Sequence, residues 1–205
     1  QFSSTRLHQK QKDGRRYATG LRNTLALTID PATGRLYGAP HGRDQLGSNW
    51  GFTDTQNAEL PAEEFLQINR GDDFGWPYCY FDQQQGKRVL APEYGGDGRS
   101  TDRCTSPKRP LLGFPGHWAP MAIAFYRGSQ FPPRFQGGAF VAFHGSWNRA
   151  PLAQEGYRVS FVPFQNGAPT GQYETFATGQ GGPTSLRASG VAVGPDGSLY
   201  IAGEN

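Results

Sequence analysis

The chain has 205 residues, including 29 Gly and 16 Pro, and its aromatic fraction is 13%. Disordered chains share such Gly and Pro contents but lack aromatic residues, so the composition indicates a folded, turn-rich all-β protein. The net charge is +3, yet the densest cationic run, from Arg6 to Arg16, has no interleaved aromatic platform, which argues against a nucleic-acid partner. No stretch approaches the roughly 18 apolar residues of a transmembrane segment, so none is expected.

The first 16 residues are expected to form a solvated edge segment that frays from the rest of the chain. The sequence starts at Gln1, not at an initiator Met. We therefore expect the start to be processed or truncated.

A hairpin recurs along the chain: a short apolar strand, a turn, and a second apolar strand ending in small residues. The turns at residues 30–34 and 194–197 contain Asp, Pro and Gly, which favour tight turns because Pro presets φ and Gly supplies positive φ. The predicted hairpins pair residues 25–29 with 35–38, 122–126 with 139–143, and 190–193 with 198–202, and further strands are predicted at 157–162 and 172–176.

Hairpins separated by several tens of residues are typical of propeller blades, whereas a β-sandwich, the alternative, has tighter and more even strand spacing. We predict one domain over residues 1–205, a partial β-propeller of roughly three to four blades. Residues 48–63 and 81–115 are polar and turn-rich, so they are interpreted as long excursions on one face.

Cys79 and Cys104 are the two cysteines of the chain, and they form no C-x-x-C motif. One disulfide closing a surface excursion is the first interpretation, and it would imply an oxidising compartment. Two free thiols are the alternative.

The segments with the most chemical content are Arg22-Asn23, before the first predicted strand, and His41-Gly42-Arg43-Asp44, after its partner strand. Both should emerge at the same end of one sheet. Arginine suits two-pronged capture of a carboxylate, and a turn around Gly can offer carbonyl oxygens to a hard cation. A purely structural pair is the alternative interpretation of Arg22 and Asn23.

Several motifs in common order carry a family resemblance over residues 17–205. They are Gly-Leu-Arg-Asn at 20–23, Glu64, Gly-Asp-Asp-Phe-Gly-Trp-Pro-Tyr-Cys at 71–79, His-Trp-Ala-Pro at 117–120, Ala-Phe-Tyr-Arg-Gly at 124–128, His-Gly-Ser-Trp-Asn-Arg at 144–149, Gly-Tyr-Arg-Val at 156–159 and Gly-Pro-Asp-Gly-Ser-Leu-Tyr at 194–200. The set resembles the pyrroloquinoline quinone-dependent soluble sugar dehydrogenases (glucose/sorbosone dehydrogenases), and it is nearer to their sorbosone branch. The resemblance implies a six-bladed β-propeller, with this chain covering its last three to four blades.

The resemblance also implies site residues. The residues that match cofactor-contacting positions are Arg22, Asn23, His41, His117, Arg149 and Arg187. The main-chain carbonyls of Gly42 and Arg43 match the ligands of an active-site calcium, and Glu64 matches a ligand of a separate structural calcium. An extracellular or periplasmic location follows from the family, as does pairing of Cys79 with Cys104.

The implied activity is oxidation of an aldose or related sugar, with hydride transfer to the quinone and electron transfer to an external acceptor, a cytochrome or a quinone. The family's general base is a His that precedes the Arg-Asn motif, and His8 does not match its surroundings, so the catalytic base is expected upstream of this chain. The alternatives are a non-catalytic extracellular binding propeller and a carbohydrate-binding propeller that uses exposed Trp. Trp76, Trp118 and Trp147 are each interpreted as packing residues.

Overall fold

The fold is seen in a computed structural model that describes residues 1–182 and 184–204. The first sheet is antiparallel and has the strand order β1 (Ala26–Ile29), β2 (Leu36–Ala39), β3 (Glu63–Ile68) and β6 (Leu112–Phe114). The β1–β2 turn is fixed by Asp30, whose side chain accepts hydrogen bonds from Ala32 N (3.1 Å) and the Thr33 hydroxyl (2.8 Å). The predicted hairpin over residues 25–38 is therefore confirmed.

The second sheet is also antiparallel and contains β7 (Pro120–Tyr126), β8 (Gly138–Phe143) and β9 (Arg158–Gln165), with β10 (Ala168–Pro169) and β11 (Glu174–Thr178) both pairing with β9. All six residues of β8 are buried, as expected of a strand with neighbours on both edges and both faces. The third hairpin is formed by β12 (Arg187–Val193) and β13 (Leu199–Glu204).

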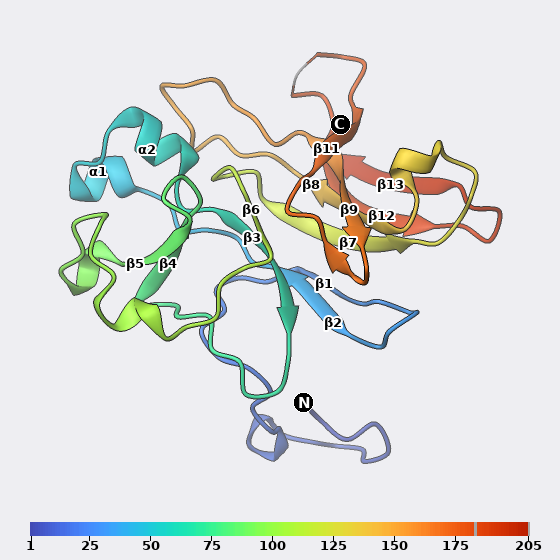
Figure 1. Ribbon diagram of the computed structural model, residues 1–205, viewed down its shortest axis with the longest axis horizontal. Helices are drawn as coiled ribbons and strands as arrows, with labels where there is room; N and C mark the ends of the chain where they lie inside the picture. The colour runs from blue at the N-terminus through green and yellow to red at the C-terminus, as the bar shows by residue number, and fades with distance from the viewer. Residues whose placement is uncertain (183, 205) are drawn as a thin grey trace.

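Consecutive sheets pack against each other through the strands that begin them. β7 contacts β1 on one side and β12 on the other (Figure 1). One buried cluster joins Tyr37 and Phe65 of the first sheet to Phe125 and Val141 of the second. A second cluster joins the second sheet to β12 and β13. The core therefore lies between the sheets, which are arranged in chain order.

The polar excursions contain more regular structure than the sequence predicts. The first holds α1 (Leu46–Trp50) and α2 (Asp54–Glu59), and β3 already begins at its last residue, Glu63. The second begins inside β4 (Cys79–Asp82), which forms a hairpin with β5 (Lys87–Leu90). The interpretation of these segments as polar, turn-rich excursions did not predict these helices and strands. Glu63 and Glu64 hid strand β3, whose partners β2 and β6 lie far away in the sequence, whereas β4 pairs with the nearby β5.

The disulfide prediction is confirmed: Cys79 and Cys104 are bonded, with their Cα atoms 5.6 Å apart. Short 3-10 turns over Gln11–Asp13, Pro92–Tyr94, Asp102–Thr105 and Pro133–Phe135 complete the described elements. None of the described helices is long and apolar enough to cross a membrane.

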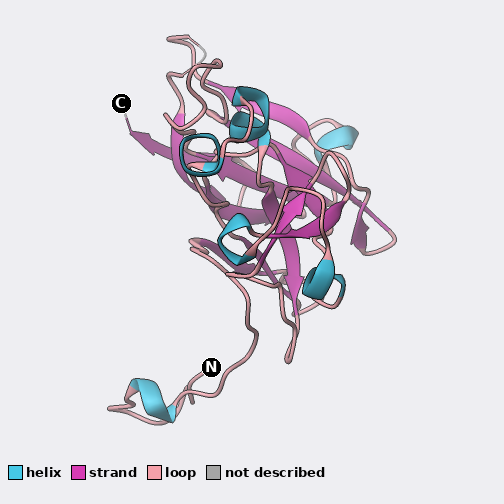
Figure 2. Cartoon of the chain, turned by 90° about the vertical axis from the view of Figure 1, so that its left-hand side faces the viewer, coloured by secondary structure: helices cyan, strands magenta, loops and turns pink. Residues whose placement is uncertain are grey.

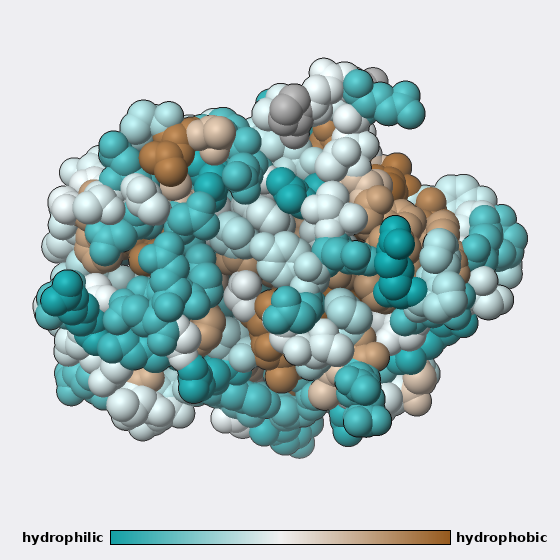
Figure 3. Space-filling view, turned by 45° about the horizontal axis from the view of Figure 1, so that its top comes forward, coloured by the Kyte–Doolittle hydropathy of each residue, from teal (hydrophilic) through white to brown (hydrophobic). Residues whose placement is uncertain are grey.

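The N-terminal segment extends away from the sheets (Figure 2), and most of its residues are exposed. Hydrophobic surface gathers on the side of the molecule that carries β12 and β13 (Figure 3). At the other end of the sheet series, Leu25, Leu27 and Ile29 on and beside β1 are 54%, 54% and 59% exposed. The all-β class is confirmed. The six-bladed architecture, the number of blades and the single domain stay predictions.

Candidate functional site

The predicted site segments meet at one end of the first sheet. Because β1 and β2 are antiparallel, with Ala26 opposite Ala39, the residues before β1 lie beside those after β2. His41 N donates to Asn23 O (2.8 Å), which continues the pairing beyond the strands. The start of β3 at Glu63 and the end of β6 at Phe114 lie opposite each other at this same end.

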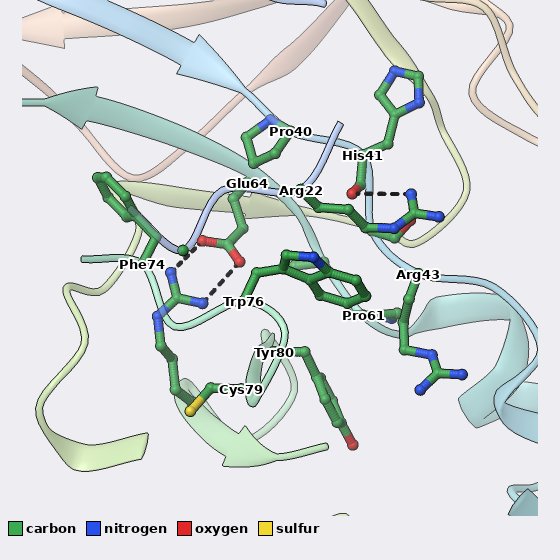
Figure 4. Close-up of a pocket in the computed structure, with 14 residues that line it drawn as sticks. Arg22, Pro40, His41, Arg43, Pro61, Glu64, Phe74, Trp76, Cys79 and Tyr80 are labelled. Atoms are coloured by element: carbon green, nitrogen blue, oxygen red, sulfur yellow. Dashed lines mark hydrogen bonds and ion pairs between the residues drawn. The ribbon is translucent and has the colours of Figure 1, made fainter. Parts of the chain in front are cut away.

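Arg22 occupies the centre of this end. Its Nη1 donates to Gly42 O (2.7 Å) and to His41 O (3.5 Å), and Nη2 lies 3.9 Å from a carboxylate oxygen of Asp44. The guanidinium carbon lies 5.6 Å from the ring centroid of Trp76, and Figure 4 shows the two side chains one above the other. The side chain is 31% exposed, so a partly solvated cation is held over an aromatic ring.

Two adjoining pockets share Arg22, His41 and Gly42 as wall residues. One has a cavity volume of ≈30 Å³ and is closed by Trp76, and the other has ≈120 Å³ and is closed by Glu63, Asp44 and His117. Sites for cofactors and other small molecules usually measure about 300–1,000 Å³. The described residues therefore build one wall of a site rather than an enclosed one.

His41 bridges the first two sheets. Its Nε2 lies 2.9 Å from Pro120 O, so this nitrogen carries the proton and donates. Burial lowers the pKa of His41, and the nearby Arg22 acts in the same direction. The neutral ring therefore keeps Nδ1 as an acceptor.

His117 is buried beneath the second pocket, and both of its ring nitrogens face protein acceptors. Nδ1 lies 3.1 Å from Asp44 Oδ1, and Nε2 lies 2.7 Å from Asn57 O. Asn148 Nδ2 donates to the same Asp44 oxygen (2.8 Å). The His117 hydrogen bond lowers the pKa of Asp44 against the opposing effect of burial, with Arg22 and Asn148 adding to the decrease. His117 thus fixes an ionised Asp44 beside Arg22.

Glu63 is a site residue that the sequence analysis missed. Its carboxylate accepts from Gly42 N (2.9 Å) and lies 3.4 Å from Ala119 N. Burial raises the pKa of Glu63 to about 7, although these two N–H groups oppose the shift. The available signal was an acidic residue immediately before an apolar strand pattern, which by itself resembles an ordinary solvated charge.

The two predicted calcium positions differ in their fit. The residues Gly42 and Arg43 both line the Trp76 pocket, and backbone carbonyls are hard oxygen ligands that suit calcium. The Arg43 side chain leads elsewhere, to an ion pair with Glu93. The carbonyl of Gly42 already accepts from Arg22 Nη1 (2.7 Å), so a cation bound there would have to displace this guanidinium.

Glu64 does not fit a metal. Its two oxygens accept from Arg88 Nη1 (2.9 Å) and Nη2 (2.5 Å), so a buried guanidinium takes the place that a cation would need. Among the described residues there is no group of three or more His, Cys, Asp or Glu that could hold a metal ion. The Arg88 guanidinium is thus the cation that neutralises Glu64 in this structure.

Three other predicted residues lie apart from the two pockets. Arg149 is buried and donates to Ala58 O (2.6 Å), Gly116 O (3.1 Å) and the Glu59 carboxylate (2.5 Å). These hydrogen bonds join neighbouring loops and leave the guanidinium turned away from the two pockets. Arg187 is exposed at the start of β12, 5.8 Å from the Tyr157 ring centroid, and the Asn23 side chain is exposed beside β1. The structure gathers Arg22, His41, Gly42, Arg43 and His117, but not Arg149 or Arg187.

The sequence is similar to a known family and to two further proteins. A TrAA12-like family model matches residues 2–205. A pyrroloquinoline quinone-dependent pyranose dehydrogenase from Coprinopsis cinerea is 30% identical over 190 residues, which cover 84% of this chain and 23% of that protein. An uncharacterized protein from Borreliella burgdorferi is 29% identical over 175 residues, covering 84% of this chain and 41% of that protein. The chain thus spans less than half the length of either relative.

Solved structures share the fold. The calcium structure of a Trichoderma reesei carbohydrate-active enzyme of family AA12 superposes with a TM-score of 0.72 at 22% identity, over 91% of this chain and 50% of that one. The holo form of the pyranose dehydrogenase quinone domain from Coprinopsis cinerea gives 0.66 at 23% identity, over 91% and 52%. The match of the family model over nearly the whole sequence shows that the chain belongs to the TrAA12-like family, among the homologues of quinone-dependent pyranose dehydrogenases.

Proposed function

We propose that this chain forms one wall of the pyrroloquinoline quinone site of a sugar dehydrogenase. The observation that carries the proposal is Arg22, a partly exposed cation stacked over Trp76 that donates to the carbonyl of Gly42. It lies at the end of the first sheet where the residues before β1 meet those after β2. The cofactor carries three carboxylates, and a desolvated carboxylate needs cationic partners. The sheets are then blades of a six-bladed propeller, whose other blades lie outside this sequence.

Each residue of the wall has a proposed task. Arg22 binds a carboxylate of the quinone and orients it, while His41 contacts its polar edge through the free Nδ1. The role of Asn23 stays a prediction from the resemblance, since its side chain is exposed outside both pockets. His117 acts indirectly by holding Asp44 beside Arg22. When bound, the quinone supplies the two-electron acceptor for oxidation of the sugar hydroxyl. Arg149 and Arg187 would reach the quinone only after a rearrangement, and their role stays a prediction from the resemblance.

Calcium binding has a structural consequence for Arg22. In the structure, Gly42 O accepts from Arg22 Nη1. Two cations do not share one carbonyl without mutual repulsion, so calcium on the carbonyls of Gly42 and Arg43 would turn Arg22 towards the quinone carboxylate. The metal would therefore both fill the carbonyl turn and release the arginine for its ligand.

The proposed reaction needs a base and an electron acceptor that this sequence does not provide. We assign the general base to a His upstream of Gln1, and the acceptor to a cytochrome or an external quinone. The Cys79–Cys104 disulfide suits an oxidising compartment, which supports an extracellular or periplasmic protein. The sugar is an aldose or pyranose, and the sorbosone branch stays a prediction.

A second candidate is a non-catalytic binding propeller of the same fold. The observation that favours it concerns the two site histidines, His41 and His117. Each has at least one ring nitrogen facing a backbone carbonyl, and His117 has both nitrogens engaged. His117 is therefore not placed to take a proton from a sugar hydroxyl, and of the two histidines only His41 keeps a free acceptor, at Nδ1.

Arg22→Ala in the full-length protein tests the proposal. Titration with the quinone and calcium should show at least about 10-fold weaker quinone binding, because a charge-assisted, two-pronged contact is lost. Arg22→Lys should restore part of the affinity, since it returns the charge without the fork. Arg134→Ala is the matched control, because Arg134 is a surface arginine whose side chain is 69% exposed and whose partner is Glu174.

Sugar-dependent dye reduction then separates the two candidates. A dehydrogenase reduces the dye once it is loaded, whereas a binding propeller takes up the quinone or sugar without turnover. Unchanged quinone affinity in Arg22→Ala would contradict the assignment of this wall.

A further inference from the structure

The loops after β2 and β8 begin with the same dipeptide, His-Gly, and each follows the second strand of a hairpin. In the second sheet, this dipeptide continues the pairing of β7 with β8. His144 N donates to Ala119 O (3.0 Å). One residue further on, Gly145 N donates to Trp118 O (2.9 Å). Both amides of this loop are therefore used by backbone carbonyls of the strand pair.

In the first sheet, the same dipeptide leaves the strand pairing after one residue. His41 N donates to Asn23 O (2.8 Å), as in the second sheet. By the pattern of the second sheet, Gly42 N would next donate to Arg22 O. It donates instead to the carboxylate of Glu63 (2.9 Å), at the start of β3. A carboxylate thus takes the place of the backbone acceptor.

Glu63 also contacts the loop before β7, where Ala119 N lies 3.4 Å from its carboxylate. Ala119 has a φ of 54°, in the left-handed region that a residue with a Cβ adopts only when its contacts hold it there. Pro120, whose carbonyl accepts from the His41 ring (2.9 Å), follows Ala119 directly. The Glu63 carboxylate and the His41 ring therefore make two neighbouring links between the same two loops.

The environment of Glu63 is not that of a stabilising charge. Its side chain is buried, and its hydrogen-bond donors are two backbone amides. In the part of the chain that the structure describes, no cation lies within ion-pair distance of Glu63, whereas the neighbouring Glu64 is paired with Arg88. A buried carboxylate without a counter-charge costs folding free energy, so stability alone does not account for this residue.

We infer that Glu63 is a positioning residue of the proposed quinone site, which holds the His41–Gly42 turn out of strand pairing. The inference rests on the proposed function for the identity of the ligand. The turn held in this way places Gly42 O where it accepts from Arg22 Nη1 (2.7 Å). It also keeps the His41 ring against Pro120, which leaves Nδ1 as the free acceptor. Pairing of Gly42 N with Arg22 O would close the turn onto the strand end and remove both features.

Glu63→Met in quinone-free full-length protein tests the inference, because it removes both acceptor oxygens at nearly the same side-chain length. The ¹⁵N spectrum of labelled histidine should show His41 with its proton on Nε2 in the wild type and a mixture of tautomers in Glu63→Met. Quinone affinity, measured by titration, should fall by about 10-fold. Glu63→Gln keeps one acceptor oxygen for Gly42 N, so it should retain the wild-type tautomer and most of the affinity.

Glu64→Gln is the matched control, because Glu64 is a buried carboxyl of the same strand whose partner is Arg88. It should lower the urea midpoint without changing the His41 spectrum. Hydrogen exchange of the wild type gives a test that needs no variant: the Gly42 amide should be protected as a strand amide is.

Three results would overturn the positioning role: a freely exchanging Gly42 amide in the wild type, the wild-type His41 tautomer in Glu63→Met, or the same tautomer change in Glu64→Gln. Unchanged quinone affinity in Glu63→Met, where Arg22→Ala weakens it, would also overturn this role. A tautomer change in Glu63→Met together with unchanged quinone affinity in Arg22→Ala would overturn the proposed function alone.

Discussion

At the scale of single residues, several buried charged groups in this protein have a partner of opposite sign. Arg88 and Glu64 are the clearest pair, with side chains 1% and 12% exposed. Arg88 Nε also donates to Lys108 O (2.7 Å). The pair joins the β4–β5 excursion to strand β3, and so fixes the floor of the Trp76 pocket, which both residues line.

Arg88→Met should destabilise the protein by about 3–5 kcal/mol, because it leaves a buried carboxylate without its counter-charge. The double variant Arg88→Met/Glu64→Gln should recover much of this loss, since it removes both charges. Urea unfolding of the full-length protein measures the difference. Calcium should not rescue Arg88→Met, since Glu64 has no companion ligands. A rescue by calcium would restore Glu64 as a metal ligand.

At the scale of elements, the three hairpins were predictable because each carries its own turn chemistry and apolar alternation. The segments Arg22-Asn23 and His41–Asp44 were placed correctly for the same reason: antiparallel pairing within one hairpin determines where its ends meet. Strand β3 was hidden, because Glu63 and Glu64 look solvated until their distant partners are known. The packing role of Arg149 also depends on carbonyls of distant loops, which no local pattern reveals.

The disulfide closes the excursion that the Arg88–Glu64 pair anchors, with a sequence separation of 25 between its cysteines. Cys79→Ser/Cys104→Ser should lower the unfolding free energy by about 3–4 kcal/mol, from the loop entropy that the crosslink removes in the unfolded state. Urea unfolding checks this, and reduction of the wild type is the control with the same expected loss. Labelling of denatured, unreduced protein should find no free thiol. An unchanged midpoint would show that the excursion is held by its ion pair alone.

At the scale of the whole molecule, the site is an open wall. The cavities beside Arg22 measure ≈30 and ≈120 Å³, too small for a three-ring quinone together with a sugar. Both ends of the sheet series expose apolar surface: Leu25, Leu27 and Ile29 at one end, and the surface at β12 and β13 at the other. Neighbouring blades of a propeller would cover such faces. The proposed propeller explains both features, because further blades would close the site and bury these faces.

The most direct measurement is a structure of the full-length protein with pyrroloquinoline quinone and calcium bound. We expect a closed propeller in which a quinone carboxylate lies about 3 Å from the Arg22 guanidinium. Calcium should lie on the carbonyls of Gly42 and Arg43, with Arg22 turned away from Gly42 O. A quinone bound elsewhere, with Arg22 still donating to Gly42 O, would contradict the account.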